Sequence, residues 1–481
     1  MAFIALVPAI YINVKQYGAT GNGSTDDTAA IQAAIAAATT GSVVFFPQGI
    51  YIVSATITYP GNITLLGSGN SESGTIIRVK PGTSLATPVL ASADWYANAL
   101  VCGNPVHISD IEIDGNSATS GSAAHGLVFM NYWSVIERCT VLNVAGDGFL
   151  YTAFNRGGTH ISNTCVEGRL LNLQARSVGG VGIHVKDDGT TLNSCTDGFL
   201  ENCTVQLAGT NAILIEMGPG WYVAGNHIYG TAMDAIYLKK CFATRVIGNY
   251  VDGYGSGSNT YIAGIGMDMI DGRGSVCLGN TVNFESGAAT GPYQAFRISG
   301  TGSAISICHV AHNLVNGGSQ SGSIGYVLQS TGSQIGHPFI VYFSNNDQRG
   351  VATGVYADTN ATGGDVNTFN HFVSDGYAPA AAAGAQAGSS PPAPVITGTD
   401  VDGSVTFGTG GSATAGAMVV VTFAQAYAAA PSVLITPSNG VTASLTLYAT
   451  ATTAALTVSC VATPASSQGN THYALNYAVM A

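Results

Sequence analysis

The chain has 481 residues, of which 8% are charged and 46% are hydrophobic, and its formal net charge is −12. This acidic balance disfavours a nucleic-acid partner, because phosphates are recognised through patches of lysine and arginine. No apolar run of about 20 residues predicts a membrane span, and the apolar start at residues 1–10 lacks the basic residues of a signal peptide. A surface rich in hydroxyl and amide groups suits a neutral, hydroxylated ligand such as a sugar.

The first predicted element is a helix over Asp26–Ala38. Either Asp26 or Asp27 can cap it, and Ile31 and Ile35 lie four positions apart on one face of an alanine-rich stretch. We therefore expect an N-terminal segment, residues 1–40, that ends in a capping helix.

From about residue 106, short strand-like segments repeat, and each is followed by asparagine or cysteine at one fixed position. That position is occupied at intervals of 64, 23, 23, 31 and 33 residues by Cys139, Cys203, Asn226, Asn249, Asn280 and Asn313. The first interval leaves room for an extra coil near Thr164 or Cys165. Such a period, with strands only, indicates a β-solenoid, and stacked asparagines can hydrogen-bond along its axis. We expect this β-helix to span residues 41–378.

The C-terminal part has a different pattern. Residues 379–394 are mostly Ala, Gly and Pro, a composition that predicts a linker. Residues 395–481 then contain five alternating apolar and polar stretches, at 418–423, 432–436, 444–448, 455–460 and 473–479. This pattern predicts a small β-sandwich.

The nine cysteines include no CxxC pair and lie scattered through strand-like segments. We expect most of them to be small, reduced core residues, as in a protein made in the cytosol.

Two stretches resemble the signatures of the pectate-lyase-like right-handed parallel β-helix superfamily. Its opening turn and capping helix are similar to residues 14–32, VKQYGATGNGSTDDTAAIQ, and its first full coil is similar to residues 106–116, VHISDIEIDGN. The resemblance covers roughly residues 12–375. In addition, residues 416–481 are similar to terminal domains of phage tail proteins.

The resemblance implies an all-β fold, with a short helical cap, a right-handed parallel β-helix and a C-terminal β-sandwich for trimerisation or carbohydrate binding. It implies a phage tail-spike or depolymerase type of protein, a homotrimer carried on the virion or released outside the cell, with a bacterial surface polysaccharide as its partner. Relatives include lyases, glycoside hydrolases, fructan transferases, epimerases and depolymerases, so the resemblance leaves the reaction open.

No cofactor or metal is predicted. The glycine-rich opening lacks the Gly-Lys-Ser/Thr of a phosphate loop, and GxSxG and HExxH are absent. Asp110, Glu112 and Asp114 alternate along one strand, where we expect an outward-facing polar edge, because a calcium loop needs further ligands at fixed positions.

Charged side chains gather on one face of the predicted coils. Alignment on the Asn/Cys position gives one inward column in the next strand of five coils: Ile183, Ile213, Ile236, Ile265 and Phe296. Two outward columns flank it: His184, Leu214, Tyr237, Gly266 and Arg297, and Lys186, Glu216, Lys239, Asp268 and Ser299. In a chain with so few charges, this face is the best candidate for a substrate groove.

Glu216 and Asp268 are the predicted catalytic carboxylates. They lie two coils apart, about 10 Å at the backbone, and side-chain reach brings them to the roughly 6.5–9.5 Å of inverting glycosidases. One would protonate the glycosidic oxygen and the other would activate water, while Lys239 between them holds one carboxylate ionised.

Four more residues of this face are predicted to bind substrate. Tyr237 can stack on a sugar ring, Arg297 can bind the carboxylate of an acidic sugar, and His184 and Lys186 complete the set. Asp147 and Asp234 are expected to form turns, with the alternative that they line the same face.

Other functions stay open. In a lyase, Lys186, Lys239 or Arg297 would act as the base or neutralise a uronate carboxylate. As a mere charge ladder between neighbouring strands, the face would belong to a non-catalytic glycan-binding adhesin or structural tail protein. A third alternative is a free polysaccharide lyase or fructan transferase.

Overall fold

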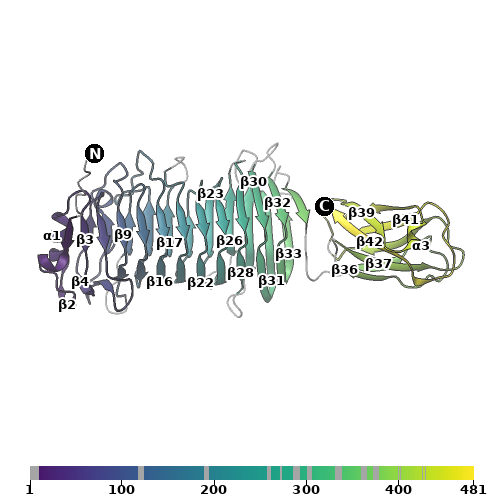
Figure 1. The fold of residues 1–481 in the computed structure, drawn as a ribbon, viewed down its shortest axis with the longest axis horizontal. Helices are drawn as coiled ribbons and strands as arrows, with labels where there is room; N and C mark the ends of the chain where they lie inside the picture. The colour runs from purple at the N-terminus through teal and green to yellow at the C-terminus, as the bar shows by residue number, and fades with distance from the viewer. Residues whose placement is uncertain are drawn as a thin grey trace, which may run out of the picture. The chain divides into compact units, whose positions relative to one another are not determined.

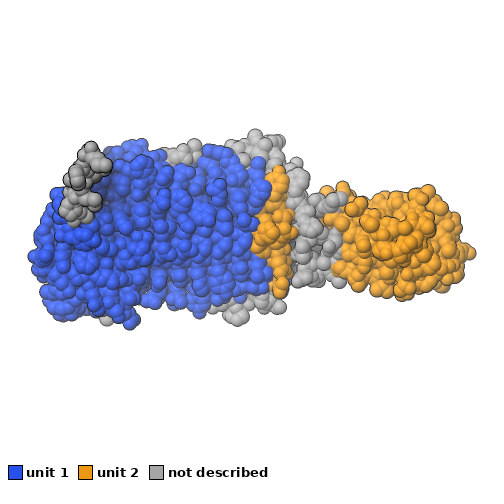
Figure 2. Space-filling model, in the orientation of Figure 1, with its two compact units in different colours: residues 1–309, 314–339, 350–366 blue, residues 310–313, 340–349, 367–481 orange. Residues whose placement is uncertain are grey.

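The structure, a computed structural model, describes residues 10–117, 124–188, 194–256, 262–270, 273–284, 293–300, 306–330, 339–358, 366–371, 379–398, 400, 402–424, 426–427 and 429–480. The chain divides into two compact units (Figure 2). The first contains residues 1–309, 314–339 and 350–366, and the second contains residues 310–313, 340–349 and 367–481.

Short parallel strands stack in three ladders and form the β-helix (Figure 1). The first ladder is a 13-stranded sheet: β1 (Tyr11–Asn13), β3 (Val43–Phe45), β6 (Thr64–Leu66), β9 (His107–Ser109), β12 (Val135–Glu137), β15 (Arg169–Leu171), β18 (Phe199–Glu201), β21 (Tyr222–Ala224), β24 (Arg245–Ile247), β27 (Ser275–Leu278), β30 (Ser306–Ala311), β32 (Phe339–Ser344) and β34 (Val366–His371).

The other two ladders belong to one large sheet, which also contains β33 (Asp347–Asp358). The second ladder is β2 (Asn22–Asp26), β4 (Gly49–Val53), β7 (Thr75–Val79), β10 (Glu112–Asp114), β13 (Thr140–Leu142), β16 (Gln174–Val178), β19 (Thr204–Ala208), β22 (His227–Thr231), β25 (Tyr250–Tyr254), β28 (Thr281–Asn283) and β31 (Leu314–Ser330). The third ladder is β5 (Ile57–Tyr59), β8 (Leu90–Ser92), β11 (Leu127–Phe129), β14 (Phe149–Thr152), β17 (Ile183–Lys186), β20 (Ile213–Ile215), β23 (Ile236–Cys241), β26 (Ile262–Met269) and β29 (Tyr293–Gly300), which then pairs with β31.

The predicted asparagine stack forms inside the coils. Asn249 donates through Nδ2 to Asn280 Oδ1 at 2.9 Å and to the carbonyl of Val223 at 3.0 Å. Its own Oδ1 accepts from Nδ2 and the backbone N–H of Asn226, at 2.9 and 3.0 Å. Asn226 in turn accepts from the backbone N–H of Cys203 at 2.9 Å. All four residues are at most 1% exposed, so each amide replaces the water that it loses on burial.

A left-handed backbone precedes every position of this stack. Gly225, Gly248 and Gly279 have φ values of 66°, 63° and 66°, which only glycine adopts without strain. Earlier coils place Arg138, Asn172 and Asn202 there, with φ of 47°, 55° and 55°. The extra coil between Cys139 and Cys203 is present, and Leu173, which follows Asn172, occupies its stack position. The prediction that this position lies near Thr164 or Cys165 is wrong.

The β-helix starts earlier than residue 41, because β1 pairs with β3 and β2 pairs with β4. A short 3₁₀ helix, η1 (Val14–Tyr17), follows β1, and the capping helix α1 spans Thr28–Ala36. Asp27 occupies the N-cap position of α1 without a capping side-chain bond, and Asp26 Oδ1 accepts from the backbone N–H of Thr28, the first residue of α1, at 3.2 Å. Asp27 instead accepts from the N–H groups of Thr20 and Gly21, at 2.7 and 3.0 Å, and so holds the glycine turn.

The second unit contains two antiparallel four-stranded sheets around an apolar core, as predicted. One sheet has the order β35 (Ala380–Ala383), β38 (Gly416–Thr422), β41 (Ala455–Cys460) and β40 (Leu447–Ala451). The other has the order β36 (Val395–Gly398), β37 (Asp402–Thr409), β42 (Gln468–Met480) and β39 (Ser432–Pro437).

Two sequence expectations for this unit need correction. The expected linker, residues 379–394, contains β35, whose backbone pairs with β38, so these alanines are part of a sheet despite their low strand propensity. The strand expected at 444–448 is displaced, because α3 occupies Gly440–Ala443 and β40 begins at Leu447.

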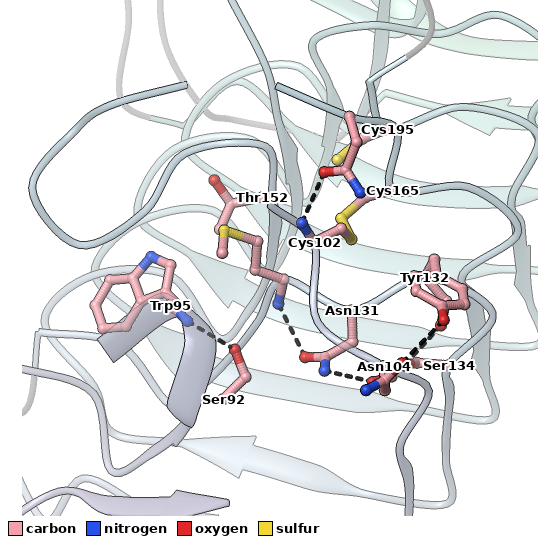
Figure 3. The surroundings of a disulfide bond; sticks show 12 residues. Ser92, Trp95, Cys102, Asn104, Asn131, Tyr132, Ser134, Thr152, Cys165 and Cys195 are labelled. Atoms are coloured by element: carbon pink, nitrogen blue, oxygen red, sulfur yellow. Dashed lines mark hydrogen bonds between the residues drawn. A yellow bond between two sulfur atoms is a disulfide. The ribbon is translucent and has the colours of Figure 1, made fainter. Parts of the chain in front are cut away.

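Two of the nine cysteines form a disulfide (Figure 3). Cys102 and Cys165 are joined across 63 residues of sequence, with their Cα atoms 5.7 Å apart. The other seven are buried thiols that form no disulfide with any described residue, as expected for most of the cysteines. Burial raises the pKa of the Cys139 thiol to about 12, which keeps it protonated and unreactive. Among the described residues, no helix is long and apolar enough to cross a membrane.

The Asn249→Ala substitution tests the stack. It removes the partners of buried groups on Asn226, Asn280 and Val223, so we expect the free energy of unfolding to fall by about 3 kcal/mol or more. Urea denaturation measures it. The control is Asn283→Ala, a half-buried asparagine that donates to the Tyr250 hydroxyl and accepts from Asn316; because water can replace these bonds, we expect a loss of about 1 kcal/mol. Equal losses for both variants would contradict a special role for the stack.

Candidate functional site

The third ladder aligns the outward columns as the sequence predicts. His184 lies opposite Leu214, Leu214 opposite Tyr237, and Tyr237 opposite Gly266. Gly266 then lies opposite Arg297, and Asp268 opposite Ser299. The expected inward column, Ile183, Ile213, Ile236, Ile265 and Phe296, is fully buried. The first outward column therefore shares one face of five consecutive coils, whereas the pairing of β23 with β26 is irregular between Leu238 and Cys241, where Lys239 lies.

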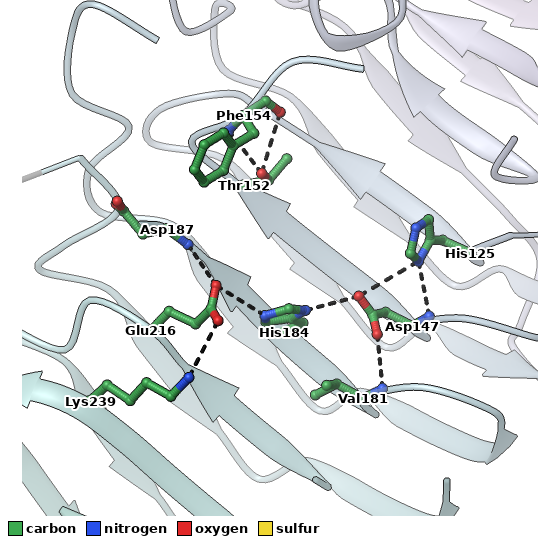
Figure 4. A network of polar contacts seen from close by, with 9 residues as sticks. All are labelled: His125, Asp147, Thr152, Phe154, Val181, His184, Asp187, Glu216 and Lys239. Atoms are coloured by element: carbon green, nitrogen blue, oxygen red, sulfur yellow. Dashed lines mark hydrogen bonds and ion pairs between the residues drawn. The ribbon is translucent and has the colours of Figure 1, made fainter. Parts of the chain in front are cut away.

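A chain of charged contacts centres on His184 (Figure 4). Its Nδ1 lies 2.9 Å from Asp147 Oδ2, and its Nε2 lies 3.5 Å from Glu216 Oε2. The other oxygen of Glu216 lies 3.5 Å from Nζ of Lys239, and Oε2 accepts from the backbone N–H of Asp187 at 3.2 Å. His184 is only 8% exposed, so it is placed to hold Glu216 rather than to lie open in solvent as a sugar ligand.

Asp147 and His125 complete this network. Asp147 Oδ1 accepts from the backbone N–H of Val181 at 2.8 Å, which ties the carboxylate to the next coil. His125 Nδ1 accepts from the backbone N–H of Asp147 at 2.9 Å, so that nitrogen carries no proton. Burial lowers the pKa of His125, which agrees with a neutral ring.

The contacts in this network shift the pKa of the histidine and of the carboxylates in opposite directions. Burial by itself would lower the pKa of His184, but Asp147 and Glu216 raise it above the ordinary 6.5. Burial would raise the pKa of Glu216, but His184 and Lys239 bring it below the ordinary 4.5. Burial would likewise raise the pKa of Asp147, but its contact with His184 and the N–H of Val181 bring it below the ordinary 3.8. At neutral pH, Glu216 is therefore an ionised carboxylate.

A second group lies on the next coils of the same ladder. The Tyr237 hydroxyl donates to Asp268 Oδ2 at 2.6 Å, and the ring has Arg297 Cζ at 5.0 Å and Lys239 Nζ at 5.6 Å from its centroid. Arg297 donates to Asp234 Oδ2 at 2.9 Å, so this nitrogen of the guanidinium is already engaged. Burial raises the pKa of Asp268 above 3.8 more strongly than Tyr237 and Arg297 lower it.

Asp147 and Asp234 occupy the same position of two coils and have the same two contacts. Asp234 Oδ1 accepts from the backbone N–H of Ala263 at 2.7 Å, as Asp147 accepts from Val181, and each second oxygen binds a basic side chain. The sequence predicts that both form turns, with the alternative that they line this face. The structure supports both statements, because one oxygen holds a turn while the other faces the columns.

A hollow of about 330 Å³ opens beside the first group. Lys186, the last residue of β17, lines it together with His125, Leu150 and Phe154. Its other lining residues are Trp95, which belongs to the short helix α2 (Ala93–Tyr96), Thr152, Asn155, Arg156 and Gly158. Sequence reasoning predicted Lys186 for the substrate face but missed the hollow, because Trp95, Phe154 and Arg156 come from segments outside the repeat.

The acidic run near residue 110 is not an outward-facing edge. Glu112 and Asp114 are each 5% exposed, and Asp114 forms an ion pair with Arg78 at 2.8 Å. Asp110 lies in a turn with φ of 61° and binds Arg138 through both oxygens, at 2.8 and 2.9 Å. The expectation of an outward polar edge is wrong, because both side chains are buried and Asp114 is bonded to Arg78, Asn116 and Asn143.

Residues 11–153 match a family described as rhamnogalacturonase A/epimerase, pectate lyase-like. The chain has a pectate-lyase-like right-handed parallel β-helix. The A-module of the mannuronan C-5 epimerase AlgE4 from Azotobacter vinelandii has the same fold, with a TM-score of 0.50 and 19% identity over 74% of this chain and 100% of that module.

Two curated relatives are of different kinds, one a phage structural protein and the other an enzyme. The pre-neck appendage protein of Bacillus phage B103 is 34% identical over 248 residues, which cover 47% of this chain and 27% of that protein. Alginate lyase 7 of Azotobacter vinelandii is 36% identical over 127 residues, 24% of this chain and 14% of that enzyme. The chain thus spans only a minor part of each relative's length.

The His184 network predicts a pH-dependent stability. A histidine whose pKa is raised on folding stabilises fully below about pH 6.5, and this contribution disappears as the pH rises through the raised value. We expect His184→Gln to lower the melting temperature most near about pH 6 and progressively less toward about pH 9. The control is His227→Gln, an exposed histidine that packs on Tyr250. A His184→Gln deficit that is constant with pH would contradict the network.

Proposed function

We propose that this chain is a phage tail-spike-like protein that binds a bacterial surface polysaccharide and cleaves it by glycoside hydrolysis. The observation that carries the proposal is that Tyr237, Lys239 and Asp268 lie on the adjoining strands β23 and β26. Glu216, directly after β20, forms an ion pair with Lys239. The likeness to a phage appendage protein and to enzymes named for polysaccharides supports the same conclusion.

In this proposal the two carboxylates have opposite roles. Asp268 retains its proton to a higher pH because it is buried, so it acts as the general acid on the glycosidic oxygen. Glu216, held ionised by His184 and Lys239, takes a proton from the attacking water. Two coils separate them, or about 10 Å at the backbone, which leaves space for a water molecule and favours inversion.

In this proposal, the remaining residues of the face bind the sugar or orient the residues that act on it. Tyr237 presents a ring for a sugar, and the exposed Lys186 lies at the mouth of the hollow, where it meets polar or acidic substituents. Arg297 holds Asp234 and packs against Tyr237, so it orients the stacking ring. His184 acts through Glu216 as a positioning residue.

The Glu216→Gln and Asp268→Asn variants test the proposal. With a panel of bacterial surface polysaccharides, we expect each to lower the rate of reducing-end formation by roughly 100- to 10,000-fold while binding is retained. The matched control is Glu201→Gln, a half-buried glutamate of β18 on the first ladder, which should retain wild-type activity.

Two other outcomes would favour a different function. Products that absorb in the ultraviolet as unsaturated uronates would indicate a lyase, which the likeness to alginate lyase 7 makes the second candidate. Lys186, Lys239 and Arg297 would then be the residues to change. Binding without any shortening would make the chain a non-catalytic adhesin, in which these ion pairs serve only the stacking of coils.

We also propose assembly as a homotrimer on the virion, supported by the likeness to the phage appendage protein. In the second unit, Leu434 of β39 and Tyr448 of β40 are 59% and 48% exposed, which suits contact with another copy. We expect sedimentation equilibrium to give three times the chain mass of 48.8 kDa, and Leu434→Glu with Tyr448→Glu to weaken association at least 10-fold. A monomer at all concentrations would contradict the trimer.

A further inference from the structure

We propose that His160, Asp187 and Asp188 form a binding site for a first-row divalent cation such as Zn²⁺ or Mn²⁺. The three residues lie where β17 ends and the insert after β14 returns to the coil, close to the hollow. This site goes beyond the proposed hydrolysis, since none of the three belongs to the two carboxylates or to the stacking residues.

The distances suit a metal ion. Nε2 of His160 lies 3.2 Å from Asp187 Oδ1 and 3.9 Å from Asp188 Oδ1, and all three ligand atoms lie within 4.8 Å of one another. Ligands that each lie about 2.1 Å from a tetrahedral or octahedral metal are about 3.0–3.4 Å from one another. A small inward movement of Asp188 therefore completes a three-ligand site.

The histidine is oriented as in metal sites. His160 Nδ1 lies 2.7 Å from the carbonyl oxygen of Ile161, and because a carbonyl only accepts, Nδ1 carries the proton. In the neutral ring, Nε2 then presents its lone pair to two carboxylates. Three electron-rich groups that face one another are brought together by a cation between them. A histidine that donates its second N–H to a backbone carbonyl is the usual arrangement around a bound metal.

The surroundings hold these ligands in place while leaving access. The side chain of Asp187 is 0% exposed, and its Oδ2 accepts from the backbone N–H of Cys195 at 3.2 Å. The His160 ring packs edge-on against Phe154 at 5.1 Å between centroids. His160 and Asp188 keep 15% and 32% of their side-chain surface exposed, so an ion can enter and retain water ligands.

The ligand set selects the class of ion. One imidazole nitrogen and two carboxylates suit Zn²⁺ and Mn²⁺, whereas Ca²⁺ prefers six to eight oxygen ligands. The site also touches the proposed catalytic residue, because the backbone N–H of Asp187 donates to Glu216 (Figure 4). A cation at Asp187 would stiffen the turn that orients Glu216.

Calorimetric titration of the full chain, stripped with a chelator and dialysed, tests the site without any glycan. With ZnCl₂ or MnCl₂ we expect one equivalent bound per chain, and a weaker response to CaCl₂. We expect Asp188→Asn and His160→Gln to lower the affinity at least 10-fold. Because Asp188 is partly exposed, its variant should fold normally, which circular dichroism verifies.

The control is His107→Gln, which changes a different histidine–carboxylate pair, 3.0 Å from Glu137, and should leave the affinity unchanged. Replacement by Co²⁺ should give visible absorption bands in the wild type that Asp188→Asn alters. Absence of stoichiometric binding would overturn the proposal and leave His160 and Asp187 as a hydrogen-bonded pair without a metal role. Binding that is equal in the wild type and both site variants would also overturn it. Neither result depends on whether the chain cleaves polysaccharide.

Discussion

Hydrogen bonding between successive coils is the constraint on which the rest of the molecule depends. Parallel strands repeat at about 4.8 Å, and the buried amides of Asn226, Asn249 and Asn280 bond directly from coil to coil. Since the side-chain period of a strand is two, a slip of one residue would turn the inward isoleucines outward and bury the charged columns. The stack and the left-handed residue before it therefore set which side chains reach the surface on each coil.

Because the chain has few charged residues, the register determines which charged groups influence one another's pKa. With only 8% of residues charged, the field at each ionisable group comes mainly from its immediate neighbours on the same ladder. His184 lies between two carboxylates and becomes more basic, while Asp268 is buried beside a tyrosine and becomes less acidic. Two acidic residues on one face thus acquire different protonation behaviour from their immediate neighbours.

Inserts between strands supply what the repeat lacks. The segment after β14 brings Phe154, Arg156 and His160 beside the ends of β14 and β17, and it lines the hollow. The disulfide between Cys102 and Cys165 fastens neighbouring inserts in the same region. A repetitive scaffold carries its own strands in register, so variation in these inserts changes ligand binding at little cost to the fold.

The sequence by itself determined the β-helix, the C-terminal sandwich and the outward columns from His184 to Arg297. These features follow from local periodicity and from one recurring asparagine, which a linear reading detects. Only the tertiary structure decided that Asp147 and Asp234 bind His184 and Arg297, that His184 is buried, and that His160 meets Asp187. Those contacts join residues from different coils and inserts, between 27 and 63 positions apart. The inserts between strands differ in length from coil to coil. The repeat in the sequence therefore does not predict which of these side chains contact one another.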